Sequence, residues 1–526
     1  MKRSFVLIGM LVVLFSTVGS LAAQGAVVWP AAEWPRSTPE EQGMDSAQLL
    51  ELLSEVDERN LSLDSLVVIR NGHLVLDANW YPYTADTLHE LYSATKSVVS
   101  TLAGIAMDQG YIEGLDQPIL ELFPGRVVAN LDENKQAITV GDVLSMGSGL
   151  RCLNVGLNVM DAMHNVEDTM QPILDLSAQP PGVAFDYCEL SAHLMIGAVQ
   201  EAIGRPVREY ADDVLFEPLG ITDYAWNTDT SGIPWGGTHL HLTPYDAARI
   251  GYLFLRDGEW DGQQIVSPEW VATATCTEPV QCPFFEQGYG YYWWVSPSSY
   301  TAAGSAGQII VVSPERDLVV VMLASGRAAG EPLTQARALL DAHLMPAVLS
   351  DEPLPANPEA IAALNARIAA IANLSPQPIT PLPDAVLNLG NVVHEIEVPI
   401  QLWPDSAVMT EERFGHSMML EHFTLHFTGE DEATLDLGFA DDSSATLVLG
   451  LDGVPRINDT LNGRIAGSGW ALPSTQEGFV AELNYIGESA VQMLTFRLRD
   501  NGLAVIWTDA VSGTTRTALA QPAPGS

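Results

Sequence analysis

The 526-residue sequence predicts an α+β domain followed by an all-β domain. Strand-like runs stand near both ends of the first 350 residues, and helical periodicities lie between them. Beyond residue 388, apolar residues alternate with polar ones in several stretches, which is typical of half-buried strands. The chain is 47% hydrophobic, so both parts can bury sizeable cores.

These patterns divide the chain into four segments. Residues 1–25 are predicted to be a signal peptide, because Lys2 and Arg3 precede an apolar run that small residues follow; an uncleaved N-terminal anchor is the alternative. Residues 26–350 form the α+β domain. Residues 351–388 form a Pro/Ala-rich linker with a helix from Pro358 to Leu374, and residues 389–526 form the C-terminal β domain, a sandwich or a barrel.

The α+β domain is predicted to begin with a hairpin. Two strands between Leu66 and Leu76 meet at Asn71-Gly72, a dipeptide typical of tight hairpin turns. A helix is expected to start at Ser93, capped by Ser93 or a neighbour, and to end at Gly110. The further expected elements are helices at Val140–Leu150, Leu194–Ile203, Val207–Leu215 and Asp246–Leu255, and strands at Tyr289–Val295, Gln308–Val312 and Leu318–Ala324.

The C-terminal segment carries clear strand signals. Apolar residues alternate from Phe423 to Phe427 and again from Leu494 to Leu498. Asp500-Asn501-Gly502 then separates the second run from Leu503–Trp507, which predicts another hairpin.

Charge excludes several classes of partner. The formal net charge is −43, so nucleic acid and anionic membrane surfaces are not expected to bind. Beyond the N-terminal apolar run, no stretch approaches the length of a membrane span, so no stable span is expected after processing. The acidity fits either a salty habitat or an ordinary acidic secreted protein. The predicted signal peptide itself indicates a periplasmic or secreted protein.

The four cysteines fit an oxidising compartment. They are Cys152, Cys188, Cys276 and Cys282, which allow three pairings. The short segment between Cys276 and Cys282 could close on itself, which would leave Cys152 to pair with Cys188. Free buried thiols are the alternative.

One lysine stands out because lysine is so rare. The chain has Lys2, Lys96 and Lys135 against 20 arginines, and Lys96 stands three residues after Ser93. Arg cannot give up its proton in proteins, whereas a desolvated ammonium can, so Lys96 is predicted to act as a base towards Ser93. A Ser-x-x-Lys spacing places both side chains on one face at the start of a helix, where the positive dipole end favours an alkoxide. No Gly-x-Ser-x-Gly elbow occurs, which argues against an α/β-hydrolase.

The motif and its context resemble the serine β-lactamase and penicillin-binding family, especially class C β-lactamase-like esterases and 6-aminohexanoate-dimer hydrolases. The resemblance runs from about residue 40 to 345 and implies a β-lactamase/transpeptidase-like fold, an antiparallel sheet flanked by helices with a helical subdomain. It is carried by Ser93-Ala94-Thr95-Lys96-Ser97, Val143–Leu150, Pro181-Gly182 with Phe185-Asp186-Tyr187, Leu242–Asp246, Tyr289–Trp294 and Gly304–Gln308.

The resemblance also implies roles for particular residues. Tyr187 would be the second-motif tyrosine, which relays a proton between Ser93, Lys96 and the leaving group. The Gly304-Ser305 stretch would be the third motif, and the backbone N–H groups of Ser93 and Ser305 would form the oxyanion hole. A bridge from Cys188 to Cys152 would brace the loop that carries Tyr187.

Two departures from the family pattern bear on the substrate. Glu189 stands where the family's Tyr-x-Asn motif has asparagine, and no lysine occurs near Gly304. The groups that would hold a β-lactam amide and carboxylate are therefore missing, and a neutral or cationic ester or amide is easier to accommodate. Gly304, Glu189 and Trp293 are the candidate substrate contacts; of Trp293 and Trp294, one is expected to line the cleft and the other to pack.

The sequence thus predicts a secreted serine hydrolase that cleaves a small ester or amide through an acyl-enzyme, without cofactor or metal. The alternatives are a D-Ala-D-Ala carboxypeptidase or weak β-lactamase, and a catalytically silent binding protein on the same scaffold. His239 and His241 alternate along one strand, but no third ligand at metal spacing accompanies them. Substrate identity, oligomeric state and the role of the β domain are not predicted.

Overall fold

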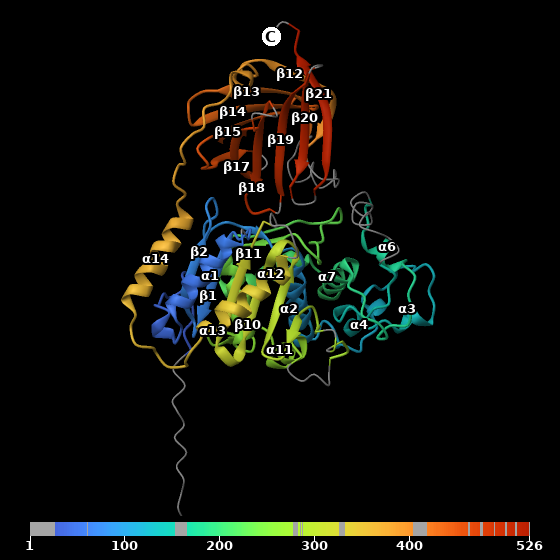
Figure 1. Cartoon of the computed structure of the whole chain (residues 1–526). Helices are drawn as coiled ribbons and strands as arrows, with labels where there is room; N and C mark the ends of the chain where they lie inside the picture. The colour runs from blue at the N-terminus through green and yellow to red at the C-terminus, as the bar shows by residue number, and fades with distance from the viewer. Residues whose placement is uncertain are drawn as a thin grey trace, which may run out of the picture.

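A six-stranded antiparallel sheet forms the centre of the first domain in a computed structural model of the chain (Figure 1). The structure describes residues 27–59, 61–152, 166–276, 282–284, 286, 288–325, 332–402, 418–460, 463–473, 477–488, 490–499, 502–510 and 513–524. The predicted signal peptide, residues 1–25, lies outside these residues, and the three boundaries between the four predicted segments stay predictions.

The sheet has the strand order β2-β1-β11-β10-β9-β8. Its strands are β1 (Ser65–Arg70), β2 (His73–Asn79), β8 (Trp294–Ser296), β9 (Ser299–Gly304), β10 (Gln308–Ser313) and β11 (Leu318–Leu323). Every residue of β1, β10 and β11 is buried, as their unbroken apolar runs require when both faces are covered. The predicted hairpin is confirmed, since Asn71 and Gly72 take positive φ angles between β1 and β2.

Helices cover both faces of this sheet. On one face, α1 (Ser46–Glu58) and α14 (Pro358–Ala372) pack against the outward side chains of β1, β10 and β11. On the other face lie α2 (Thr95–Asp108) and α10 (Pro244–Leu255). The helix expected in the linker is α14, and its buried Leu364 and Ile371 join the first domain's core. The ion pair between Arg367 and Asp57 adds a polar contact to the same helix pair.

Further helices complete the first domain, and most expected helices are present. They are α3 (Glu133–Ala137), α4 (Val140–Leu144), α6 (Met170–Leu174), α7 (Glu189–Ile203), α8 (Val207–Ala211), α9 (Glu217–Leu219), α11 (Pro268–Ala274), α12 (Pro332–Leu339) and α13 (Met345–Ala347). The short helix α15 (Asp384–Leu387) belongs to the C-terminal domain, because its buried Val386 lies in that domain's core. Gly204 ends α7 at φ 68°, as predicted. The helix expected at Val140–Leu150 stops at Leu144, because Met146 takes a φ of 61°.

The strand expected at Tyr289–Val295 is wrong over most of its length, because β8 begins only at Trp294. The backbone turns at Tyr292, whose φ is 63°. The hydroxyls of Ser97 and Ser100 on α2 donate to the carbonyls of Tyr292 and Tyr291, at 2.6 and 2.7 Å. These carbonyls therefore bond to a helix rather than to a neighbouring strand.

The C-terminal domain is a closed barrel, which decides between the two predicted architectures. Its ten strands run in the order β15-β14-β13-β12-β21-β20-β19-β18-β17-β16, and a pairing of Gly450 in β15 with Ser468 in β17 closes the circle. They are β12 (Val393–Gln401), β13 (Met419–Phe427), β14 (Glu432–Phe439), β15 (Ser444–Gly450), β16 (Arg456–Thr460), β17 (Gly463–Ala471), β18 (Gly478–Tyr485), β19 (Ala490–Arg499), β20 (Gly502–Asp509) and β21 (Thr515–Pro522). The expected alternations lie in β13 and β19, whose buried side chains fill the barrel.

Two small sheets accompany the main sheet of the first domain, and one of them contacts the barrel. They are built from β3 (His89–Glu90), β4 (Ala225–Trp226) and β5 (Leu240–Leu242), and from β6 (Glu259–Trp260) and β7 (Gln263–Gln264). The turn between β18 and β19 reaches β3, where the N–H of Glu90 donates to the carbonyl of Gly487 at 2.9 Å. Only glycine fits at 487, since a Cβ there would lie 2.1 Å from the carbonyl oxygen of Leu88. The barrel therefore contacts the first domain at β3, directly before the turn that precedes α2.

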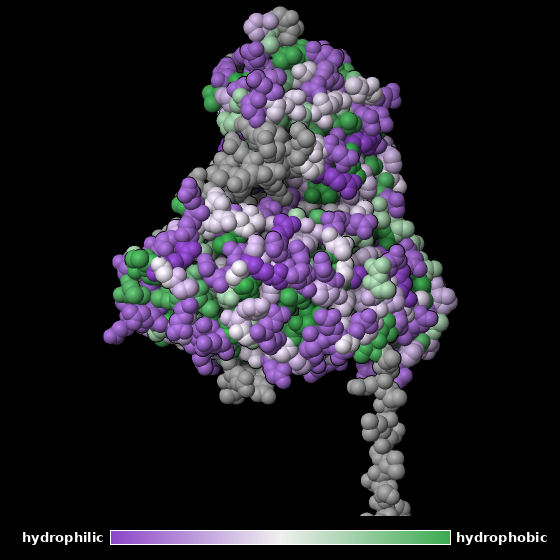
Figure 2. Space-filling model, turned by 180° about the vertical axis from the view of Figure 1, so that it is seen from behind, coloured by the Kyte–Doolittle hydropathy of each residue, from purple (hydrophilic) through white to green (hydrophobic). Residues whose placement is uncertain are grey.

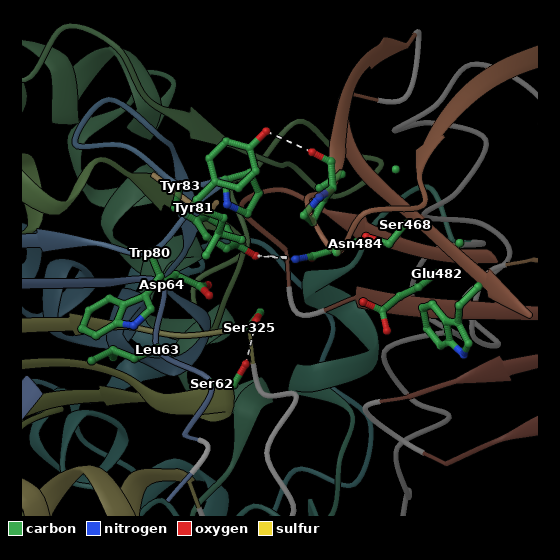
Figure 3. Close-up of a pocket in the computed structure, with 18 of the residues that line it drawn as sticks. Ser62, Leu63, Asp64, Trp80, Tyr81, Tyr83, Ser325, Ser468, Glu482 and Asn484 are labelled. Atoms are coloured by element: carbon green, nitrogen blue, oxygen red, sulfur yellow. Dashed lines mark hydrogen bonds between the residues drawn. The ribbon is translucent and has the colours of Figure 1, made fainter. Parts of the chain in front are cut away.

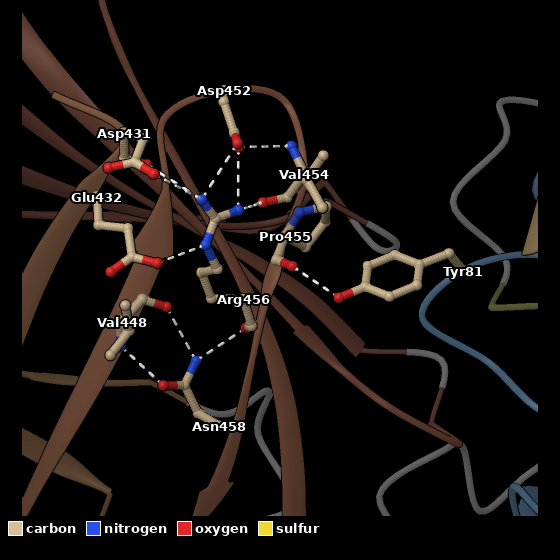
Figure 4. Close-up of polar contacts among 9 residues, drawn as sticks. All are labelled: Tyr81, Asp431, Glu432, Val448, Asp452, Val454, Pro455, Arg456 and Asn458. Carbon is tan, nitrogen blue, oxygen red and sulfur yellow. Dashed lines mark hydrogen bonds and ion pairs between the residues drawn. The ribbon is translucent and has the colours of Figure 1, made fainter. Parts of the chain in front are cut away.

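A second contact fastens the barrel through the loop that precedes β16. The Tyr81 hydroxyl donates to the carbonyl of Pro455 at 3.0 Å (Figure 4). Arg456 holds this loop by binding Asp452 and Glu432, and its guanidinium holds the pKa of Asp452 below the usual value. Between the domains lies a cavity of about 590 Å³ lined by residues of both, Trp80, Asp64 and Glu482 among them (Figure 3).

The face of the molecule seen in Figure 2 is polar with scattered apolar areas. Among the described residues, no helix is both long and apolar enough to cross a membrane.

Candidate active site

Ser93 stands on a tight turn immediately before α2. The turn is a 3-10 helix from Tyr92 to Ala94, and Tyr92 takes a φ of 47°, which non-glycine residues rarely adopt. The N–H of Leu91 donates to the carbonyl of Leu240 at 2.8 Å and fixes the entry to the turn. The expectation that Ser93 or a neighbour caps α2 is wrong: the helix begins at Thr95, and no side chain caps it. The Ser93 hydroxyl is instead directed to the side chains described next.

Lys96 is buried and contacts Ser93 directly. Its side chain is 1% exposed, and its Nζ donates to Ser93 Oγ at 2.9 Å. Two further acceptors surround Nζ, namely the carbonyl of Gly237 at 2.9 Å and Glu189 Oε2 at 2.6 Å. The three acceptors match the three N–H donors of an ammonium group. The Lys96 amine is therefore shielded from bulk water and lies within hydrogen-bonding range of the Ser93 hydroxyl.

Glu189 joins Lys96 and Ser93 into one network. Its Oε1 accepts a hydrogen bond from Ser93 Oγ at 3.3 Å, while Oε2 faces the lysine. Glu189 is the first residue of α7, so the positive end of that helix favours its carboxylate. Space for the carboxylate depends on Gly237, because a Cβ at that position would lie 2.3 Å from Glu189 Oε2.

Tyr187 lies beside this network. Lys96 Nζ lies 5.0 Å from the centre of its ring, which stacks on Trp294 at a centroid distance of 6.0 Å. Among the described residues, no hydrogen bond of the Tyr187 hydroxyl is found. Tyr289 packs edge-on against the same ring, and burial raises the pKa of Tyr289 well above its usual value, so this neighbour stays a neutral phenol.

Gly304 brings the end of β9 against the Ser93 turn. A Cβ at Gly304 would lie 2.2 Å from the carbonyl oxygen of Leu91 and 3.1 Å from the backbone nitrogen of Ser93. Only a glycine allows this close approach. Because Ser305 directly follows Gly304, its backbone lies beside the turn that carries the Ser93 hydroxyl, and the residue itself is exposed.

Trp293 does not line the site, contrary to its selection as a substrate contact. It is 0% exposed and packs against Phe254 and Tyr300 in the core, at centroid distances of 4.4 and 5.5 Å. Trp294 is half-buried and stacks on Tyr187. One tryptophan packs and its neighbour faces the site, as expected, but with the two roles exchanged.

Both expected disulfides are present. Cys152 pairs with Cys188 and Cys276 with Cys282, at Cα–Cα distances of 5.9 and 5.8 Å. Cys188 lies between Tyr187 and Glu189, so the first bridge ties the segment that carries both side chains to Cys152. The described part of the chain contains no free cysteine.

Sequence reasoning missed Gly237, whose carbonyl is a ligand of the Lys96 amine and whose missing side chain admits Glu189. The pair Gly236-Gly237 ahead of β5 was the only local signal. A group near the site that could hold a metal ion, formed by Glu90, His241 and Glu488, was not predicted from the sequence either.

Two features define the class of serine β-lactamase-like hydrolases. One is an antiparallel sheet with flanking helices, and the other is a buried lysine hydrogen-bonded to a serine on the turn before a helix. The chain matches the family model described as Beta-lactamase over residues 47–344, more than half of its length, and it belongs to this family. The fold class predicted from the resemblance is confirmed, and the protein is an enzyme, a serine hydrolase of this family.

Similar proteins fit this assignment. The chain is 22% identical over 348 residues to the 6-aminohexanoate-dimer hydrolase of Paenarthrobacter ureafaciens, covering 59% of this chain and 84% of that protein. It is 27% identical over 191 residues to the esterase/beta-lactamase LipL of Mycobacterium tuberculosis (strain ATCC 25618 / H37Rv), covering 35% of this chain and 40% of that protein. A solved structure of a β-lactamase candidate from Bacteroides dorei DSM 17855 matches with a TM-score of 0.50 at 20% identity, over 58% of this chain and 100% of that one.

Proposed function

We propose that the protein cleaves a small ester or amide through an acyl-enzyme, with Ser93 as nucleophile. The observation that carries this proposal is the 2.9 Å contact between Lys96 Nζ and Ser93 Oγ in a buried setting. A serine hydroxyl is a weak nucleophile until a neighbouring group takes its proton, and the pair supplies such a group.

The proton path that we propose runs through Lys96 to Glu189. As Ser93 Oγ attacks the carbonyl carbon, its proton passes to Lys96 Nζ while one lysine proton passes to Glu189 Oε2. Lys96 thus acts as the base for Ser93. Because it gains one proton and loses another, it remains a cation beside Ser93 Oγ. The distances of 2.9 and 2.6 Å along this path support it, since both lie within hydrogen-bonding range.

The negative charge of the tetrahedral intermediate falls to the backbone. We assign the oxyanion hole to the N–H groups of Ser93 and Ser305, and the close approach of Gly304 to the Ser93 turn supports this role. Tyr187 is placed to hand a proton to the leaving group, because its ring lies beside Lys96 and its hydroxyl makes no competing hydrogen bond among the described residues. Water then attacks the acyl carbon and gives a proton to the Tyr187 oxygen, while the proton held by Glu189 returns through Lys96 to Ser93 Oγ, so that each group regains its starting state.

The substrate class follows from what surrounds the nucleophile. Glu189 adds a carboxylate, and lysine is absent from the stretch after Gly304, so a substrate that carries a carboxylate near the scissile bond meets no counter-ion there. A neutral or cationic ester or amide suits the site better than a β-lactam. Ester and amide substrates are also consistent with the hydrolases that the chain resembles.

We also propose that the mature protein works outside the cytoplasm, after removal of residues 1–25. The two disulfides support this location, because such bonds persist in oxidising compartments.

A panel of p-nitrophenyl esters, short linear amides and β-lactams tests the proposal, with the wild type and Ser93→Ala compared on each compound. Turnover of esters or amides that Ser93→Ala abolishes is the expected result. Ser296→Ala, which changes an exposed serine of β8, serves as the matched control and should keep wild-type turnover. Turnover confined to β-lactams would favour the β-lactamase alternative, and no turnover of any compound would favour a silent binding protein.

A further inference from the structure

A second cluster of chemically active side chains lies where the barrel meets the first domain. One nitrogen of His241 and one carboxylate oxygen each from Glu90 and Glu488 lie within 4.8 Å of one another. Glu90 belongs to β3, His241 to the neighbouring strand β5, and Glu488 to the turn between β18 and β19 of the barrel. None of the three takes part in the proposed chemistry of Ser93.

The hydrogen bonds of His241 fix which of its nitrogens can bind a ligand. Its Nδ1 lies 3.1 Å from the carbonyl of His239, and a carbonyl oxygen can only accept, so Nδ1 carries a hydrogen. In the neutral ring Nε2 then bears a lone pair, and this atom faces Glu488 Oε1 at 3.1 Å. Two acceptors face each other at this distance only if a cation lies with them, either a proton on Nε2 or a metal ion. A backbone carbonyl on the far nitrogen is also the usual support of a histidine that binds metal.

The charge of the cluster favours the metal ion over the proton. Glu90 is 3% exposed, and the side chains of His241 and Glu488 are 7% and 12% exposed. Protons balance both carboxylates only if His239, which lies 2.7 Å from Glu90 Oε1, is charged as well as His241, whereas one divalent cation balances both and leaves the two rings neutral. Burial makes each charged imidazole costly, so the divalent occupant is the better match.

A second histidine lies beside Glu90. His239 Nδ1 lies 2.7 Å from Glu90 Oε1, yet this buried nitrogen makes no contact with hydrogen-bond geometry. The hydroxyl of Thr238 donates to the same carboxylate oxygen at 2.9 Å and orients it. Imidazole nitrogen combined with carboxylate oxygen suits Zn²⁺, while Ca²⁺ and Mg²⁺ prefer oxygen alone.

We propose that Glu90, His241 and Glu488 bind a Zn²⁺ ion that fastens the barrel to the first domain. The ion would join the β18–β19 turn to β3 and β5 beside the existing bond between Glu90 N–H and the Gly487 carbonyl. Figure 1 shows the lower ends of the barrel strands, β18 among them, above the first domain. Since β3 leads within three residues to Ser93, the same ion holds the segment that enters the nucleophile turn.

Titration calorimetry on the purified, tag-free full chain tests the site after EDTA treatment and dialysis, with Zn²⁺ as the probe and Ca²⁺ as the comparison. We expect one Zn²⁺ per chain, little Ca²⁺ binding, and an upward shift of the thermal unfolding midpoint with Zn²⁺. Glu488→Gln and His241→Gln should each weaken Zn²⁺ binding by at least about tenfold and remove the thermal shift. Asp436→Asn is the matched control, because Asp436 pairs with His426 on the barrel without a second carboxylate, and it should bind Zn²⁺ as the wild type does.

Two results of the binding measurements overturn the proposal. Either the wild type binds no Zn²⁺, which assigns the cluster to a proton on His241, or Glu488→Gln and His241→Gln bind Zn²⁺ as tightly as the wild type. Circular dichroism shows whether the variants are folded. Anomalous scattering at the zinc edge from wild-type crystals grown with Zn²⁺ gives a reading that needs no variant: a peak between Glu90, His241 and Glu488 is expected, and a peak elsewhere alone contradicts the site.

Discussion

Replacing Glu189 by glutamine isolates the contribution of its negative charge. The change keeps the shape of the side chain, but an amide cannot take up the proton that leaves Lys96, and it no longer balances an ammonium 2.6 Å away. Loss of one proton-transfer group typically lowers a rate by about 10² to 10⁴-fold. We therefore expect kcat on the best ester to fall at least about 100-fold, about 2.7 kcal/mol of transition-state stabilisation, with a smaller change in KM.

The assay compares kcat and KM of the wild type, Glu189→Gln and Glu201→Gln. Glu201 lies near the other end of α7, and its side chain is 42% exposed against 39% for Glu189. Glu201→Gln therefore makes the same chemical change on the same helix at a similarly exposed position. Glu201→Gln should leave both constants unchanged. If Glu189→Gln raises KM and leaves kcat intact, Glu189 contacts substrate only and the proton path is refuted.

Three further predictions concern the surroundings of the site. Gly237→Ala should lower kcat strongly without unfolding the chain, because the added methyl would meet Glu189 Oε2; activity equal to the wild type would contradict the geometry of that contact. Replacing Cys152 and Cys188 together by serine should lower stability by about 3–4 kcal/mol, the loop-closure value for their sequence separation of 36, and unchanged urea and thermal midpoints would count against a bracing role. Burial lowers the pKa of His89 to about 4, so unfolding takes up a proton below pH 6.5; the wild type should lose about 2 kcal/mol between pH 7 and pH 5 from this group, and His89→Gln should lose correspondingly less in urea titrations at the two pH values.

Elements whose neighbours are close in sequence could be predicted well. The hairpin at Asn71-Gly72 and the end of α7 at Gly204 follow from local backbone requirements, and the apolar runs of β10 and β11 specify buried strands. The strand expected at Tyr289–Val295 failed because its carbonyls bond to Ser97 and Ser100, about 190 positions away.

The architecture of the C-terminal domain shows the same limit. Alternation in β13 and β19 predicts strands with one buried face, which a sandwich and a barrel share. The closure depends on the pairing of Gly450 with Ser468, and alternation carries no information about which strands meet.

The candidate site divides along the same line. Ser93 and Lys96 could be found because one helical turn brings them together. Glu189 meets Lys96 across 93 positions and Gly237 meets it across 141, so only the folded chain shows that the carboxylate in the asparagine position faces the lysine. The sequence also did not show that Glu488 lies beside His241, because Glu488 comes from the other domain and the two meet only in the folded chain.

Fluorophosphonate labelling of the wild type and Lys96→Arg, followed by peptide mass spectrometry, tests the activation of Ser93 by Lys96 most directly. Arg keeps the positive charge but cannot take up a proton. We expect a covalent label on Ser93 in the folded wild type and a labelling rate at least about 100-fold lower in Lys96→Arg. A label on another residue, or equal labelling of Ser93 in both proteins, would contradict it.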